Sequence, residues 1–119
     1  MSGIIFFRTQ NLKDCVSFYT KKLGMEIWLD QEACIILEKG NLLLGFCQAD
    51  EPETSGMITF FYETKEEVDK IFLQFKQESI TEPEENEKFR IYQFFAKDPE
   101  GRVLEFQSFL HPIKWTFEK

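Results

Sequence analysis

Apolar positions along the chain follow two periods, and the order of these patterns occurs twice. Runs rich in Ile, Phe and Leu predict strands, and segments with apolar residues at i, i+3, i+4 and i+7 predict helices with one buried face. Each half of the chain reads strand, helix, strand, strand, strand, over residues of about 3–48 and about 56–109. The pattern predicts an α+β protein of two βαβββ modules in a single domain, followed by a tail at 110–119.

The expected elements can be placed on the sequence. In the first module we expect strands at 3–9, 25–30, 33–39 and 41–47, and a helix between Asn11 and Gly24. In the second we expect strands at 57–63, 79–81, 89–97 and 102–109, and a helix opened by the capping box Thr64–Glu67. The charged stretch 82–88 is expected to be a solvated loop.

One charge interrupts the last predicted strand. Glu105 stands between Leu104 and Phe106, and a carboxylate in an apolar strand needs a cation, a metal, a hydrogen-bond donor or exposure to solvent. Alignment of the two halves pairs Ile4 with Met57, and pairs Leu44 with Glu105. Glu105 is thus the charged member of these four positions.

Composition narrows the range of partners. The chain has 119 residues, 43% of them hydrophobic, and 14 Phe residues, which suit a large core or an apolar cavity. A net charge of −7 argues against a nucleic-acid-binding surface and favours a cationic ligand over an anionic one. No apolar stretch approaches the roughly 20 residues that span a bilayer, so we expect no membrane partner.

The cysteines and the first residues bear on the compartment. Cys15, Cys34 and Cys47 are odd in number and have no C-x-x-C spacing, which predicts reduced thiols that serve packing. MSGIIFFRTQ lacks the basic start and cleavage site of a signal peptide. Together these features predict a cytoplasmic protein.

Two groups of residues resemble the signatures of the vicinal oxygen chelate superfamily, which includes glyoxalase I, bleomycin-resistance proteins and extradiol dioxygenases. They are Asn11-Leu12, Phe18-Tyr19 and Leu23-Gly24 near the start, and Asp98-Pro99-Glu100-Gly101-Arg102 with Leu104-Glu105-Phe106 near the end. The resemblance covers residues of about 3–109. It implies two modules whose sheets curve around a shared cleft, often in a homodimer.

The resemblance also implies where a divalent metal would lie. Metal-dependent members hold the ion with side chains of the first and last strands of each module, which the alignment places at Ile4, Leu44, Met57 and Glu105. Ile and Leu have no lone pair to donate, and a Met thioether is a poor ligand for the ions these enzymes use. We therefore expect no metal and no other cofactor, with a divalent metal as the alternative.

Alternation along the strands predicts which side chains accompany Glu105. Ile4, Phe6 and Arg8 share one face of the first strand, and Val103, Glu105 and Gln107 share one face of the last. We expect a mostly apolar cleft, the usual composition of a small-molecule pocket. Its predicted lining includes Phe6, Arg8, Leu44, Met57, Thr59, Glu105 and Gln107.

Three functions fit these features. The first is a metal-free protein that binds a small molecule, cationic or aromatic, in the cleft, and this reading leans away from an enzyme. The second is a glyoxalase-like lyase or isomerase, or a dioxygenase-like enzyme, with Glu105 as general base or metal ligand. The third is a dimeric interaction module whose cleft is filled by its own aromatic residues.

For Glu105 itself, an ion pair or hydrogen bond with Arg8 or Gln107 is the structural alternative. The tail residues Ile113, Trp115 and Phe117 alternate, as expected of a surface covered by a second subunit.

Overall fold

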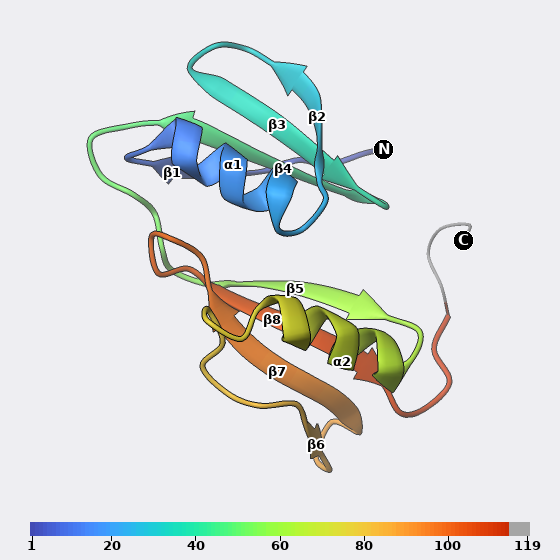
Figure 1. Ribbon diagram of the computed structural model, residues 1–119. Helices are drawn as coiled ribbons and strands as arrows, with labels where there is room; N and C mark the ends of the chain where they lie inside the picture. Colours follow the sequence, from blue (N-terminus) through green and yellow to red (C-terminus); the bar gives the residue numbers. More distant parts are fainter. Residues whose placement is uncertain (115–119) are drawn as a thin grey trace. The chain divides into compact units, whose positions relative to one another are not determined.

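Two βαβββ modules make up the protein, and the sequence prediction of an α+β fold is confirmed (Figure 1). The computed structural model describes residues 1–114, which form two compact units, Met1–Thr54 and the chain from Ser55 onward. Trp115 and Phe117, which were expected to help form a subunit surface, lie outside the described residues.

The first unit is a four-stranded mixed sheet with one helix. Its strands have the order β1-β4-β3-β2, in which β1 is parallel to β4 and the other pairs are antiparallel. The predicted meander of the last three strands is therefore present. The elements are β1 (Ile5–Thr9), α1 (Leu12–Lys21), β2 (Glu26–Asp30), β3 (Cys34–Lys39) and β4 (Leu42–Gln48).

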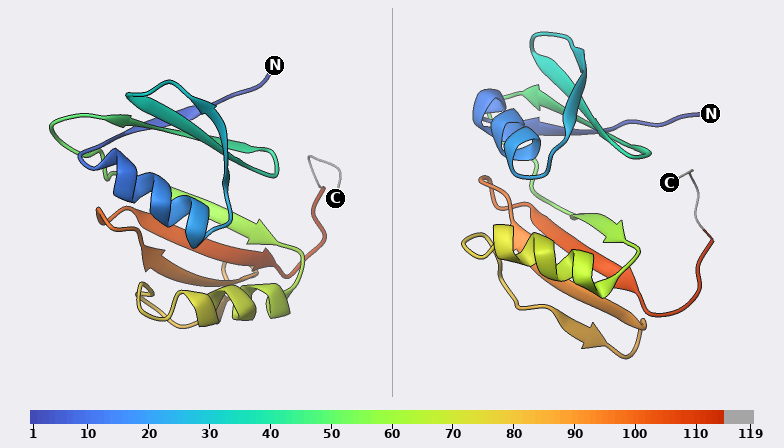
Figure 2. Two further views of the ribbon diagram at one scale, coloured as in Figure 1. Left: turned by 45° about the horizontal axis from the view of Figure 1, so that its top comes forward. Right: turned by 45° about the vertical axis from the view of Figure 1, so that its right-hand side comes forward.

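The second unit repeats this order. Its sheet reads β5-β8-β7-β6, again with the first and last strands of the module parallel. The helix α2 lies along one face of the sheet in both views of Figure 2. The elements are β5 (Met57–Tyr62), α2 (Lys65–Gln74), β6 (Glu84–Asn86), β7 (Ile91–Lys97) and β8 (Val103–Phe109).

Local sequence signals set the starts of both helices. The Asn11 side chain accepts a hydrogen bond from the Asp14 backbone N–H, and so caps α1. Thr64 and Glu67 form the predicted capping box at α2, each side chain bonding the other residue's backbone N–H. These bonds satisfy amides that the first helical turn leaves without partners.

A phenylalanine occupies the centre of each core, between helix and sheet. Phe46 is fully buried, with its ring centroid 4.8 Å from that of Tyr19 and 6.1 Å from that of Phe7. Phe106 is fully buried in the second unit, 5.0 Å from Phe75 and 5.5 Å from Phe60 by the same measure. The helix-facing positions of the two modules thus correspond.

This correspondence corrects the internal alignment by one residue. The pair Phe7–Phe46 matches Phe60–Phe106, so the last strands align at an offset of 60 residues rather than 61. Glu105 therefore corresponds to Gly45, not to Leu44. Leu44 is on the helix-facing side, 1% exposed, and its prediction as a residue of the open face was wrong.

The third strand of the second module is also displaced from its predicted place. Ser79–Thr81 makes only a single bridge, Ser79 to Ala96, whereas the acidic stretch expected to be a loop contains β6. Three residues of β6 pair with β7, from Glu84 opposite Gln93 to Asn86 opposite Ile91. Pairing with β7 overrides the low strand propensity of Glu and Asn.

Two of the three cysteines form a disulfide, so the prediction of three reduced thiols was wrong. Cys34 and Cys47 are register partners on β3 and β4, with Cα atoms 4.0 Å apart, and their sulfurs are bonded. Cys15 is a free, buried cysteine on α1. The spacing of the cysteines along the chain does not reveal the pair, because the antiparallel pairing of β3 with β4 brings the two residues together.

The predicted turn between β7 and β8 holds a buried ion pair. Asp98 accepts hydrogen bonds from the backbone N–H groups of Glu100 (2.9 Å) and Arg102 (3.0 Å), and from Arg102 Nη1 (3.0 Å). Arg102 also donates to Glu100 at 2.9 Å and is 2% exposed. Gly101 has φ of 92°, a conformation that favours glycine in the turn.

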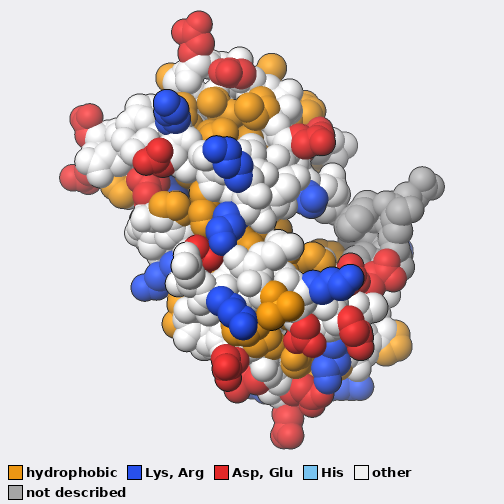
Figure 3. Space-filling model, in the orientation of Figure 1, with side chains coloured by type: hydrophobic (Ala, Val, Ile, Leu, Met, Phe, Trp, Pro, Cys, Tyr) orange, Lys and Arg blue, Asp and Glu red, His pale blue; other side chains and the backbone are white. Residues whose placement is uncertain are grey.

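The surface carries charges of both signs. On the face shown in Figure 3, acidic and basic side chains are interspersed rather than gathered by sign. Within residues 1–114, both helices are too short and too polar to cross a lipid bilayer.

Candidate ligand-binding site

Glu105 lies on the open face of the second unit's sheet, opposite the face that α2 covers. Its register partners are Thr59 on β5 and Phe95 on β7. Leu104 and Phe106, its chain neighbours, point the other way into the core and are fully buried. The alternation that predicted a shared face for Glu105 and Gln107 therefore agrees with the observed sheet.

The Glu105 carboxylate is 6% exposed and has one hydrogen-bond donor among the described residues. Thr59 Oγ1 donates to Glu105 Oε1 at 2.8 Å. Among residues 1–114, Gln107 makes no hydrogen bond with this carboxylate, so that alternative is not formed, whereas a bond with Arg8, which belongs to the other unit, stays a prediction. A second carboxylate oxygen is left to accept from a bound molecule.

A pocket of about 440 Å³ opens beside this carboxylate. Its volume is within the range of roughly 300–1,000 Å³ that small-molecule sites have. Among the described residues that line it, Glu105 is the one ionisable side chain, and aromatic and aliphatic groups make up most of the rest. The lining residues are Met57, Asn86, Phe89, Ile91, Gln93, Phe95, Glu105, Gln107 and Phe109.

Two amide side chains accompany the carboxylate. Gln93 and Gln107 are register partners on β7 and β8, and Gln93 is 9% exposed. Within the described residues, neither side-chain amide is engaged in a hydrogen bond. Each amide can therefore donate and accept toward a molecule in the pocket. Phe89 and Met57, 60% and 52% exposed, are the most accessible apolar groups of the lining.

The predicted site residues divide between the two units. Met57, Thr59, Glu105 and Gln107 come together on the open face of the second sheet. Phe6 and Arg8 lie on β1 of the first unit, where Phe6 is beside Gly45 and Arg8 is beside Cys47. A shared cleft between the modules remains a prediction.

The half of the pocket that β7 and β6 supply was not predicted from the sequence. Ile91, Gln93 and Phe95 alternate along β7, and this period was visible in the chain. What was not visible is which of the two alternating sets faces the helix, because both contain aromatic residues. Asn86 could not be placed without β6.

The donor set does not fit the metal site that the fold resemblance implied. With the corrected alignment, its four positions are Ile4, Gly45, Met57 and Glu105. Glycine, like isoleucine, offers no side-chain ligand atom, so a single carboxylate stands where several donors are needed. Residues 1–114 contain no group of three or more His, Cys, Asp or Glu side chains arranged to hold a metal ion.

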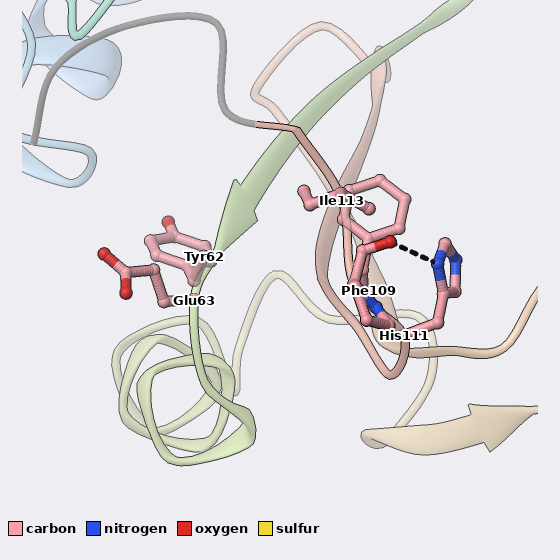
Figure 4. A pocket seen from close by; sticks show the side chains of 6 residues that line it. Tyr62, Glu63, Phe109, His111 and Ile113 are labelled. Atoms are coloured by element: carbon pink, nitrogen blue, oxygen red, sulfur yellow. Dashed lines mark hydrogen bonds between the residues drawn. The ribbon is translucent and has the colours of Figure 1, made fainter.

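A second, smaller pocket of about 210 Å³ lies at the ends of β5 and β8 (Figure 4). Burial, and secondarily the negative charge of Glu67, raise the pKa of Tyr62 to about 12. His111 lies on the far side of Phe109 from Tyr62 in Figure 4, and its Nδ1 is 3.1 Å from the Pro112 carbonyl oxygen. Tyr62 and His111 therefore do not converge on one point, and we assign no chemistry to this pocket.

Comparison with known proteins agrees with the architecture. Solved structures with this fold include a glyoxalase/bleomycin resistance protein/dioxygenase from Nocardioides, 18% identical with a TM-score of 0.78, covering 96% of this chain and 86% of that one. An integron cassette protein from the Halifax Harbour sewage outfall metagenome is 22% identical, with a TM-score of 0.79 and coverage of 91% and 97%. A lactoylglutathione lyase from Agrobacterium tumefaciens is 18% identical, with a TM-score of 0.75 and coverage of 91% and 92%.

Identities this low establish the fold alone. No curated protein matches the chain. The model of one family matches residues 3–106, which is most of the sequence and includes both βαβββ modules. The chain therefore belongs to the Glyoxalase/Bleomycin resistance protein/Dioxygenase superfamily.

Proposed function

We propose that the protein binds a small organic molecule on the open face of the second sheet, without a metal. One observation carries the proposal: the Glu105 carboxylate, 6% exposed, borders an apolar pocket and has Thr59 as its hydrogen-bond donor. A buried carboxylate is costly unless its oxygens are satisfied. A ligand that donates to the second oxygen would remove that cost.

The chemistry of the lining defines the ligand class. A positively charged or strongly donating group would meet Glu105, and the amides of Gln93 and Gln107 would bond polar atoms beside it. Phe95, Phe109 and Ile91 would cover a flat apolar frame. We therefore propose an aromatic cation, such as an aryl-amidine or benzylic ammonium, as the preferred type of ligand.

Binding is a better account of this pocket than catalysis. Within the part of the chain that the structure describes, Glu105 is the one ionisable group of the lining, and general acid–base catalysis usually relies on a second group to receive or return the proton. The four metal-ligand positions of the corrected alignment supply one carboxylate ligand, that of Glu105. Both features support a binding protein over a lyase or dioxygenase.

Matched small probes test the proposal. Benzamidine, benzamide and benzoate share a frame and differ in charge, and binding of each can be measured by calorimetry and by NMR shifts. We expect benzamidine to bind most tightly and benzoate least, and we expect Glu105→Gln to weaken benzamidine about 10- to 100-fold, the value of a charge-assisted hydrogen bond. Glu63→Gln, outside this pocket, is the charge-matched control.

Two results would contradict the proposal. The first is equal binding of benzoate and benzamidine, or benzamidine binding that Glu105→Gln leaves unchanged. The second is stoichiometric binding of Zn²⁺, Ni²⁺, Mn²⁺ or Fe²⁺ that Glu105→Ala abolishes, which would restore the metal-dependent alternative.

A further inference from the structure

Three side chains form a row across the open face of the first unit's sheet. Arg8 on β1 is the register partner of Cys47 on β4, and Cys47 is the partner of Cys34 on β3. Register partners on neighbouring strands project from the same face, with strands about 4.8 Å apart. The disulfide therefore has a guanidinium-bearing residue as its neighbour on the adjacent strand.

The backbone holds the two sulfurs together independently of the bond between them. β3 and β4 pair continuously from Cys34–Cys47 to Lys39–Leu42, and the Gln48 N–H donates to the Ala33 carbonyl at 2.8 Å beyond the disulfide. A hairpin of this kind keeps its register when one side-chain bond is cut. The two thiols would remain neighbours after reduction and could join again.

Accessibility distinguishes this pair from the third cysteine. Cys34 and Cys47 are both half-buried, on the face of the sheet that the helix does not cover. Cys15 is 2% exposed, in the core beneath α1. Access to the disulfide sulfur is one of the factors that set the rate of exchange.

We propose that Cys34–Cys47 is a reversible redox site whose substrate is a low-molecular-weight thiol or dithiol. The thiolate of the reductant attacks Cys34 Sγ, the S–S bond breaks, and Cys47 leaves as a thiolate that takes a proton from water. The second thiol of a dithiol, or a second molecule of a monothiol, then attacks the reductant's sulfur in the mixed disulfide. The reductant leaves as a disulfide, and Cys34 is released as a thiolate that takes a proton from water. The protein gains two electrons and the dithiol loses two.

Arg8 favours Cys47 over Cys34 as the sulfur that leaves in this exchange. Arg8 is the register partner of Cys47, and a positive charge on that neighbouring position would stabilise the thiolate that leaves when Cys34 is attacked. The Glu53 carboxylate accepts from the Arg8 backbone N–H at 2.8 Å, so an anion is also near the row. Removal of the Arg8 charge would leave Glu53 to oppose the developing thiolate.

Disulfides that are accessible at a protein surface are more labile than buried ones. The site lies in the first unit and is independent of the ligand pocket proposed for the second.

Alkylation of the native protein tests the proposal. The folded chain is equilibrated with oxidised glutathione or with dithiothreitol, quenched in acid, alkylated after unfolding, and weighed by mass spectrometry. We expect one alkylated cysteine after oxidation and three after reduction, and one again after the reductant is exchanged for oxidised glutathione. Peptide mapping should assign the two that change to Cys34 and Cys47. Three thiols after oxidation, or a pair that excess dithiothreitol reduces only in denaturant, would overturn the proposal.

Reduction kinetics test the role of Arg8. We expect Arg8→Gln to slow reduction by dithiothreitol about two- to fivefold, and Arg8→Lys to keep the original rate. Lys13→Gln, an exposed residue on α1, removes the same charge elsewhere and should leave the rate unchanged. Equal rates in Arg8→Gln and the original protein would overturn the assignment to Arg8. The alkylation experiment uses the original protein, so its result does not depend on these variants.

Discussion

The ring of Phe6 lies over Gly45, its register partner, in the place where a side chain at position 45 would project. The equivalent partners in the second unit are Thr59 and Glu105, joined by a hydrogen bond. One position of the repeat thus carries a carboxylate in the second unit. In the first unit, the same position carries no side chain and is covered by an aromatic ring.

Gly45→Ala should destabilise the protein, because a Cβ there would collide with the Phe6 ring. We expect the free energy of unfolding to fall by about 1–3 kcal/mol, the usual cost of overpacking, in urea denaturation. Gly3→Ala, whose added Cβ would meet nothing within 4 Å, is the control. The double variant Phe6→Ala/Gly45→Ala should cost less than the two single changes together. Strict additivity would contradict the contact.

Thr59→Val should leave the buried carboxylate without its hydroxyl donor. We expect a loss of about 1–3 kcal/mol in the free energy of unfolding, because a buried acceptor loses its partner. Thr20→Val is the control, since the Thr20 hydroxyl donates to the neutral Val16 carbonyl. A loss at Thr59 no larger than at Thr20 would show that the bond to Glu105 contributes little.

Asp98→Asn should be among the more damaging substitutions. Arg102 would stay buried, 2% exposed, with Glu100 as its remaining carboxylate, and we expect a loss of about 3 kcal/mol. Lys65→Met breaks the exposed ion pair with Glu85 and should change stability by about 0–1 kcal/mol. Chemical denaturation of both variants checks the contrast, and similar effects of the two would refute it.

Loss of the disulfide should lower stability without abolishing the fold. The bond closes a loop with a sequence separation of 13, for which loop entropy predicts about 3 kcal/mol. The variant Cys34→Ser/Cys47→Ser should unfold at lower urea concentration than the oxidised protein, and at about the concentration that unfolds the reduced protein. Cys15→Ser provides a variant that retains the bond. An unchanged midpoint in the double variant would contradict this prediction.

Tyr62 should make stability fall in strongly alkaline solution. Its pKa is about 12 in the folded protein against 10.0 for an ordinary tyrosine, chiefly because the phenol is buried. A raised pKa means that the stabilising contribution is complete below about pH 10 and is lost as pH rises toward 12. Two pKa units correspond to about 2–3 kcal/mol. Near-ultraviolet absorbance should show the late ionisation, and Tyr62→Phe should flatten the fall. Equal pH dependence in that variant would contradict the assignment.

Local patterns in the chain were enough to establish most of the fold. The capping residues Asn11 and Thr64 fixed the helix starts, because a cap bonds backbone groups within its own turn. The repeated order of elements, with period-2 and period-3.6 segments, determined two βαβββ modules. Alternation placed Glu105 and Gln107 on one face.

Pairing between distant segments decided the rest. In the observed register of β4 against β1, Leu44 lies in the core and Gly45 lies opposite Phe6. A shift of one residue exchanges the two faces of a strand. In an uninterrupted apolar run such as Leu42–Leu44, polar and apolar residues do not alternate, so the sequence does not indicate which residues face the core.

The elements, the repeat and the charged residue beside the pocket could be predicted from the amino-acid sequence, because they depend on neighbours along the chain. The contacts of Cys34 with Cys47, of Asn86 with β7 through β6, and of Thr59 with Glu105 were seen only in the folded sheets. Each of these contacts depends on strand register, and register is set by the summed packing and hydrogen bonding of whole strands rather than by any local signal.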